Sequence, residues 1–227
     1  MIHIEHRATA SRVMRSIVVA LTVVAPALHA QSPEQTLDRA VAAWATVKTA
    51  RASFEQTVTN SLTGSTANAR GEFQQQRPNK LSIRFTDPAG DRIVSDGASV
   101  WVYLPSSAPG QVVKRSASDE NAVPIDITGE FLTDPKSRYT VTAAGTATVS
   151  GHAAHALTLG PKPGTNAVFD RATIWVDDDD ALVRQFEAVE HSGITRRVRI
   201  TSLDVNVPVD RSAFTFTPPT GVKVVVR

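Results

Sequence analysis

Histidines and carboxylates are the residue types in this chain that could hold a metal ion or move a proton. His152 and His155 lie in the segment Gly-His-Ala-Ala-His, which is predicted to be a strand or a turn. Their spacing there places the two rings on no shared helical face, and no glutamate accompanies them as in a helical zinc motif. Two surface histidines are therefore expected, and no metal site.

The acidic run Asp177-Asp178-Asp179-Asp180 resembles a calcium-binding loop only in composition. It lacks the glycine at the sixth position and the distal glutamate that such a loop needs, so a charged hairpin turn is predicted. The sequence has no glycine-rich phosphate loop and no Gly-x-Ser-x-Gly nucleophile motif. These observations predict a protein without a cofactor that is not an enzyme, with a hydrolase acting on lipid as one alternative.

Residues 1–30 are predicted to be a cleaved secretory signal peptide. Arg7, Arg12 and Arg15 precede a short apolar run over 17–28, and Leu28-His29-Ala30 offers a cleavage site. A membrane anchor or a buried helix is the alternative, but the run is short for a membrane span and contains Pro26. Residues 31–227 are expected to form a single domain in the periplasm.

The charge balance argues against a nucleic-acid partner. The chain has 24 Lys and Arg against 22 Asp and Glu, and removal of residues 1–30 leaves 21 of each. No clustered basic face is apparent in what remains. Cysteine is absent, so disulfides and thiol chemistry are excluded.

The elements that position these residues begin with one amphipathic helix. Ser32, Pro33 and Gln35 have the order of an N-cap, a first-turn proline and a capping-box partner. Leu37, Val41 and Trp44 follow at helical spacing. The sequence predicts a helix of about four turns with Trp44 on its apolar face.

After this helix the apolar residues alternate, as in strands that have one buried face. Turn signals such as Asp96-Gly97 and Ser192-Gly193 separate the segments. One antiparallel sheet, strongly curved or nearly closed, is predicted. The expected strand segments are 54–58, 81–85, 93–95, 99–104, 153–159, 172–176, 182–189 and 195–203.

One predicted strand is apolar on both faces. Val100, Val102 and Leu104 lie on one face, and Trp101 and Tyr103 lie on the other. A half-buried strand should have one polar face, so either a second layer covers the other face or an apolar cavity opens there. The irregular segment 116–137 is predicted to be a loop with one or two short helices that could cover the sheet.

Several segments, taken in order, resemble the LolA family of outer-membrane lipoprotein carriers. The resemblance extends over nearly the whole chain after residue 30. The segments that carry it are Ala52-Ser53-Phe54-Glu55-Gln56, Gly71-Glu72-Phe73 leading to Arg77-Pro78-Asn79, Ser95-Asp96-Gly97 followed by Trp101, Phe186-Glu187-Ala188-Val189-Glu190, and Phe214-Thr215-Phe216-Thr217-Pro218-Pro219 ending in Gly221-Val222.

The resemblance implies a mainly β fold with a few helices: an unclosed, strongly curved antiparallel half-barrel with an α-helical lid over an apolar cavity. It implies a monomeric carrier that accepts acylated lipoproteins from an inner-membrane ABC transporter and delivers them to an outer-membrane receptor. Acyl chains need such shielding because each CH₂ that leaves water is worth about 0.8 kcal/mol. Without a nucleotide site, a carrier of this kind moves cargo by differences in affinity.

The resemblance also indicates site residues. Arg77 matches an arginine that in the family is thought to bind the backbone of the lid helices and hold the cavity shut. Leu81, Ile83 and Phe85, with Trp101 and Tyr103, are the candidates for lining the cavity. Which face of each strand is concave is open at this point, because a shift of one residue exchanges the two faces.

Two alternatives remain within the same fold. Pro124, Gly129 and Pro135 fall in the segment where the family has lid helices, so the lid could be shorter or differently shaped. The chain could then be a paralogue that binds another lipid or glycolipid. A sensor of lipid or lipoprotein that does not ferry its ligand is the second alternative.

Overall fold

The computed structural model describes residues 31–118 and 127–227, and Gln31–Arg227 forms one compact unit. The predicted signal peptide lies outside the described residues, as does Pro124. No helix in the described part of the chain is long and apolar enough to cross a membrane.

Helix α1 (Pro33–Ala45) begins as the sequence predicts. The Ser32 hydroxyl accepts from the Gln35 backbone N–H, and the Gln35 side chain accepts from the Ser32 backbone N–H. Leu37, Ala40 and Trp44 are buried on one face of the helix. Burial of this apolar face, with the capping box, explains where the helix starts and how it lies.

The strands form one twelve-stranded sheet in the order β12-β6-β5-β4-β3-β2-β1-β11-β10-β9-β8-β7. All neighbouring strands are antiparallel except β12 and β6, which are parallel. The strands are β1 (Thr49–Asn60), β2 (Thr66–Gln76), β3 (Lys80–Asp87), β4 (Ala89–Asp96), β5 (Ser99–Tyr103), β6 (Gln111–Ser116), β7 (Tyr139–Val149), β8 (His152–Pro161), β9 (Phe169–Asp177), β10 (Val183–Glu190), β11 (Ile194–Val205) and β12 (Lys223–Val226).

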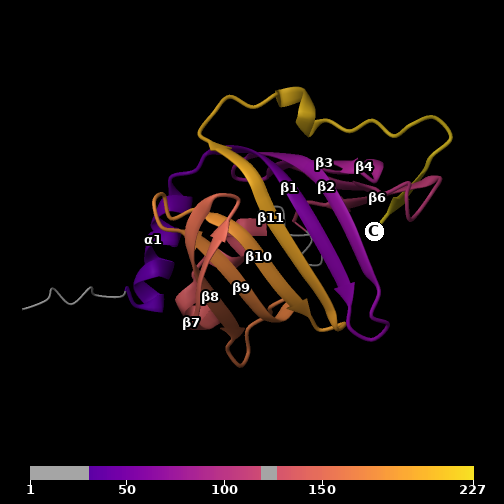
Figure 1. Ribbon diagram of the computed structural model, residues 1–227. Helices are drawn as coiled ribbons and strands as arrows, with labels where there is room; N and C mark the ends of the chain where they lie inside the picture. Colours follow the sequence, from indigo (N-terminus) through magenta and orange to yellow (C-terminus); the bar gives the residue numbers. More distant parts are fainter. Residues whose placement is uncertain (1–30, 119–126) are drawn as a thin grey trace, which may run out of the picture. The chain divides into compact units, whose positions relative to one another are not determined.

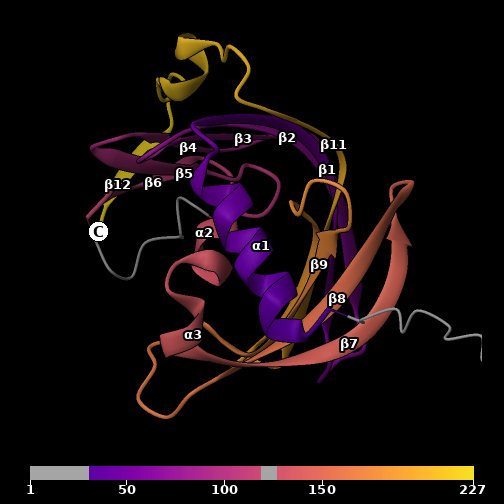
Figure 2. The same cartoon turned by 90° about the vertical axis from the view of Figure 1, so that its left-hand side faces the viewer.

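The sheet curves without closing, because β12 and β7 stand at its two edges. Figure 2 shows it bending around α1 and α2 (Ile127–Leu132), which lie on its concave side with α3 (Pro135–Arg138) nearby. The predicted fold class is confirmed, and the described part of segment 116–137 contains the two short helices expected. Strands β2, β6, β7 and β12 were not predicted.

The C-terminal segment 206–222 covers part of the convex face, and it contains the 3₁₀ helix η1 (Arg211–Phe214) (Figure 1, yellow). Phe214 is buried, and the ring of Phe216 lies 5.6 Å from Trp101 and 5.7 Å from Tyr103 between centroids. The two-sided apolar strand β5 is thus explained by a second layer over its outer face.

Candidate functional site

A cavity of about 860 Å³ opens on the concave face of the sheet. The register aligns Phe73 of β2, Ile83 of β3, Ile93 of β4 and Val102 of β5 in one row across four strands, and all four line the cavity. Leu81, two residues before Ile83 on the same face of β3, also lines it. A volume of this size is at the upper end of the range for sites that enclose small apolar ligands.

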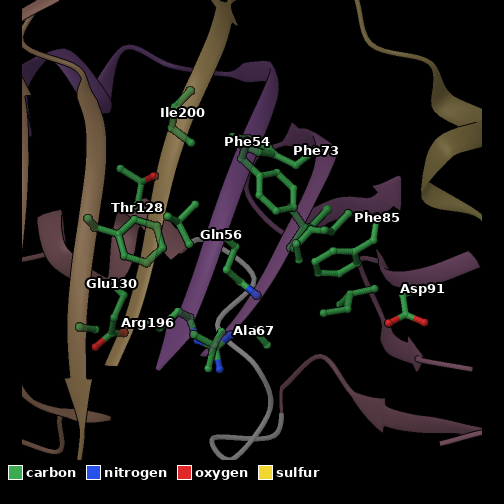
Figure 3. A pocket seen from close by; sticks show the side chains of 18 of the residues that line it. Phe54, Gln56, Ala67, Phe73, Phe85, Asp91, Thr128, Glu130, Arg196 and Ile200 are labelled. Carbon is green, nitrogen blue, oxygen red and sulfur yellow. The ribbon is translucent and has the colours of Figure 1, made fainter. Parts of the chain in front are cut away.

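Aromatic rings form part of the cavity wall on β1 and β3. Phe54 and Phe85 meet edge to face, with ring centroids 5.7 Å apart (Figure 3). Gly71 of β2 makes room for this pair, because a Cβ there would lie 2.5 Å from the Arg84 carbonyl oxygen and 2.9 Å from the Phe54 ring. In the Gly71-Glu72-Phe73 motif, Gly71 thus leaves space for an aromatic ring of the cavity wall, and Phe73 lines the cavity.

The opposite wall comes from β10, β11 and α2. Val183, Phe186 and Ala188 of β10 line it together with Val198 and Ile200 of β11. The ring of Phe131 in α2 lies 5.2 Å from that of Phe186 and closes this side. The cavity is thus bounded by the curved sheet and by one lid helix.

A few polar groups interrupt the apolar lining. Arg196 pairs with Glu190 at 3.2 Å, and Gln56 lies in the same region (Figure 3). Asp91 accepts hydrogen bonds from both the backbone N–H and the hydroxyl of Ser106. Gln75 is the buried polar residue of the lining whose amide nitrogen has no hydrogen-bond partner in the described structure.

Arg77 holds the C-terminal end of α1. Its Nη1 donates to the carbonyl oxygens of Trp44 at 2.9 Å and Val47 at 3.4 Å, and its guanidinium lies 5.5 Å from the centre of the Trp44 ring. The last carbonyls of a helix have no partner within the helix, and a cation there is favoured by the helix dipole. The Arg77 side chain thus joins the β2–β3 turn to α1.

Helix α2 is held by a different set of contacts. The Glu130 carbonyl oxygen accepts from Arg138 Nη1 at 2.8 Å and from the Tyr139 hydroxyl at 3.2 Å. Arg138 also forms an ion pair with the Glu130 carboxylate. Burial and then the negative charge of Glu130 raise the pKa of Tyr139 above its ordinary value. Tyr139 therefore stays a neutral hydrogen-bond donor beneath the lid.

The structure brings together three of the cavity candidates and separates the other two. Leu81, Ile83 and Phe85 lie on the lining, and their contact with a ligand stays a prediction. Placing Trp101 and Tyr103 in the cavity was wrong, because the register of β5 turns both to the convex face against Phe216.

Other lining residues were missed by the sequence reasoning. Phe73, Val102 and Phe186 line the cavity but are not among the residues predicted to do so. A correct register from Ile83 would have found Phe73 and Val102, since all three belong to one row across the sheet.

The histidines and the acidic run lie at one end of β8 and β9, away from the cavity lining. His152 Nδ1 is 2.8 Å from Asp177 Oδ2, and His155 pairs with Asp178. Within the described residues there is no group of three or more His, Asp or Glu side chains that could hold a metal ion. The run 177–180 forms the turn between β9 and β10, as predicted.

Asp177 is an anchoring group of this turn. It is buried with Arg184, whose Nε donates to it at 2.7 Å. Burial raises the pKa of Asp177, but the hydrogen bonds from the Asp179 backbone and from Arg184, with the charge of Arg184, lower the pKa overall. Arg39, in the middle of α1, donates to the Asp178 carbonyl at 2.8 Å, so the turn also anchors the helix.

Comparisons with known proteins agree with this geometry. The family described as "Outer membrane lipoprotein carrier protein LolA" matches residues 45–217. An outer-membrane lipoprotein carrier protein of Serratia proteamaculans is 32% identical over 178 residues, which cover 78% of this chain and 81% of that protein. The corresponding protein of Proteus mirabilis is 27% identical over 178 residues, covering 78% and 82%.

Among solved structures, an uncharacterized conserved protein of Thermus thermophilus shares the fold. Its TM-score is 0.53 at 13% identity, and the match covers 87% of this chain and all of that one.

Proposed function

The chain belongs to the LolA family of outer membrane lipoprotein carrier proteins, and from this we propose that it carries lipoproteins through the periplasm with their acyl chains held in the cavity. The observation that carries the proposal is the apolar cavity of about 860 Å³ between the concave sheet and α2. The cavity gives acyl chains an apolar environment that shields them from water.

The energetics explain why such a carrier is needed. Each CH₂ moved from water into an apolar site contributes about 0.8 kcal/mol, so an acyl chain of about sixteen carbons contributes about 12 kcal/mol. A lipoprotein released without shielding would aggregate or return to the membrane. A cavity that exchanges contacts with a membrane for contacts with Phe73, Ile83 and Phe186 removes most of this barrier.

We propose an inner-membrane ABC transporter as the donor and an outer-membrane receptor as the acceptor. The described residues offer a binding cavity, and the proposed role needs no catalytic step. Cargo moves because the donor, this protein and the acceptor bind the acyl chains with different affinities. Binding without turnover is therefore the activity that we assign.

Arg77 is proposed to control access to the cavity. Its bonds to the Trp44 and Val47 carbonyls fix α1 against the β2–β3 turn. One side chain that holds two carbonyls can release both in a single rotamer change. Helix α1 contacts α2, so separation of α1 from this turn would free α2, which borders the cavity, to move away and admit cargo.

A transfer assay tests the proposal. The purified protein is mixed with a triacylated lipoprotein in detergent, the detergent is removed, and the sample is sedimented. We expect the lipoprotein to stay in the supernatant as a one-to-one complex, whose mass native mass spectrometry would give. The same lipoprotein with its lipidated Cys replaced by Ser should form no complex, because it has no acyl chains.

Two results would contradict the proposal. The first is sedimentation of the acylated lipoprotein despite an excess of the protein. The second is the recovery of a glycolipid, with no lipoprotein, from protein purified directly from periplasm. Turnover of a soluble ester substrate by the purified protein would show a hydrolase instead.

A further inference from the structure

Gln75 is an unexpected residue for the wall of an apolar cavity. The residue is 4% exposed and lies on the cavity lining, and its strand neighbours on either side are Ala50 of β1 and Leu81 of β3. Its Nε2 atom is buried and has no hydrogen-bond partner among the residues that the structure describes. A polar amide with an unpaired donor thus lies between two apolar strand neighbours.

The folded protein alone offers no reason for this arrangement. The great majority of buried polar groups in proteins have a hydrogen-bond partner, because a buried donor without one has lost its bonds to water and gained nothing. Methionine would fill nearly the same volume without that penalty. An acceptor supplied by a ligand accounts for the amide.

The surroundings of Gln75 narrow the chemistry of the acceptor. The amide is neutral and its strand neighbours Ala50 and Leu81 are apolar, so the group suits an uncharged acceptor on an otherwise apolar ligand. An acyl chain has one such group, the carbonyl oxygen of its ester or amide linkage. An alkyl chain of the same length, joined through an ether, has no carbonyl.

We propose that Gln75 donates a hydrogen bond from Nε2 to the carbonyl of an acyl chain in the cavity and so selects acyl chains over alkyl chains. This inference rests on the proposed function, because it assumes that the cavity holds lipid. It assigns to Gln75 the polar contact that orients the chain, with its carbonyl towards β2 and its hydrocarbon along the apolar row.

The position of Gln75 also links recognition to the lid. Gln75 is two residues from Arg77, which holds the end of α1. Release of α1 at this end brings water to the amide, and water competes for the hydrogen bond that the dry cavity favours. Carbonyl recognition is then strongest in the closed state and weakest during release.

The test compares two soluble lipids that differ only in this carbonyl. 1-Palmitoyl-lysophosphatidylcholine has an ester linkage, and its 1-O-hexadecyl analogue has an ether. We expect the wild-type protein to bind the ester about three- to tenfold more tightly below the micellar concentration, measured by displacement of a fluorescent fatty acid. In Gln75→Met the two dissociation constants should become equal, while ether binding stays at least as tight as in the wild type.

Gln56→Met is the matched control, because Gln56 lines the same cavity. This variant should keep the preference for the ester. Gln75→Leu should repeat the result of Gln75→Met, and both should unfold thermally at or above the wild-type temperature without ligand, because they remove an unpaired buried donor.

Each outcome separates the two proposals. Equal binding of ester and ether by the wild type, or a preference that survives in Gln75→Met and Gln75→Leu, overturns the role of Gln75 and leaves the carrier function standing. Loss of the preference in Gln56→Met overturns the assignment to Gln75. Binding of neither lipid by the wild type contradicts the proposed function and, with it, this inference.

Discussion

The apolar concave face of the sheet is covered differently in two regions. Over β7, β8 and β9 the face is filled by the protein itself: α1 contacts all three strands, and Leu157, Leu159 and Ile174 are fully buried. Over β2 to β5 the face is left hollow, with Phe73, Ile83, Ile93 and Val102 bordering the cavity. We call these the filled region (β7–β9 with α1) and the cavity region (β2–β5).

The difference teaches how one layer can serve both stability and binding. A sheet must cover its apolar face, and it can do so with its own helices or with a ligand. The filled region supplies the packing that keeps the curved sheet folded while the cavity is empty. On the outer side of the cavity region, Phe214 and Phe216 of the C-terminal segment supply packing instead.

The sharpest test of this comparison removes the same atoms in each region. Leu159 of β8 is completely buried, and Leu104 after β5 borders the cavity and is half-buried. Leu159→Ala should lower the free energy of unfolding by about 2–5 kcal/mol, because it loses buried contacts and creates a void. Leu104→Ala borders an existing space and should lose about 1 kcal/mol or less.

Urea unfolding followed by circular dichroism measures both variants. Equal losses of unfolding free energy would contradict the division into a filled and a hollow region. A change of slope with denaturant in one variant alone would show that its unfolded or native state had changed in compactness.

The contact that joins the two regions is the second target. Arg77→Leu leaves the carbonyls at the end of α1 without this donor and should lower the free energy of unfolding by about 1.5–3 kcal/mol. Arg84→Leu is the control, because Arg84 forms an exposed ion pair with Glu72 at 2.7 Å, which is worth about 1 kcal/mol or less.

Hydrogen exchange distinguishes a lid contact from general stability. Faster exchange in Arg77→Leu should appear in α1, with β8 and β9 close to wild type. We also expect this variant to impair lipoprotein transfer while it keeps the fold. Wild-type transfer together with unchanged exchange in α1 would remove Arg77 from the control of access.

The third comparison replaces a small side chain with a large one in each region. Ala172 of β9 is 1% exposed inside the filled region, so Ala172→Trp should overpack it and lower the free energy of unfolding by about 1–3 kcal/mol or more. Ala69 of β2 lines the cavity, so Ala69→Trp should project into empty space and change stability by less than about 1 kcal/mol.

Binding should show the reverse order. Ala69→Trp should weaken the binding of a fluorescent fatty acid about tenfold or more, because the indole occupies ligand space. A folded Ala172→Trp protein should bind the probe like the wild type. Undiminished binding by Ala69→Trp would mean that the ligand lies elsewhere.

The sequence predicts the elements that have local signals, and it misses those that form only by pairing with neighbouring strands. Helix α1 and the strands β8 to β11 were predictable because capping residues and apolar alternation are local signals. Strands β2 and β7 were missed because their sequences are rich in Gln, Thr and Ala, residues that do not alternate clearly between apolar and polar. These strands form because their neighbours in the sheet pair with them.

The site was predictable only in part for the same reason. Of the candidates, Leu81, Ile83 and Phe85 lie on the cavity lining, whereas Trp101 and Tyr103 lie on the convex face. Large aromatic residues fit a cavity or an outer layer equally well by pattern alone. The deciding fact, that Phe216 returns across the convex face, is a contact between residues far apart in the chain.

The smallest expected effect is on the pH dependence of stability, and it comes from one carboxylate that stabilises a turn in each region. Asp177 ends β9 in the filled region, and Asp96 begins the β4–β5 turn of the cavity region. Burial raises the pKa of Asp96, but its hydrogen bonds from the Ser99 and Ala98 backbone lower it overall, and the pKa of Asp177 is lowered as well. Each carboxylate therefore stabilises the fold above the unfolded pKa of about 3.9, and this contribution is lost as pH falls through the lower folded pKa.

Asn variants should therefore flatten the rise of unfolding free energy with pH between about pH 2 and 5, by about one proton each. At pH 7 they should differ, because Asn at position 96 can still accept from Ala98 and Ser99, whereas Asp177→Asn deprives buried Arg184 of a charged partner. Urea unfolding from about pH 2 to pH 7 gives both quantities. An Asp177→Asn protein as stable as Asp96→Asn at pH 7 would show that the buried ion pair adds nothing to the filled region, and that its stability comes from apolar packing alone.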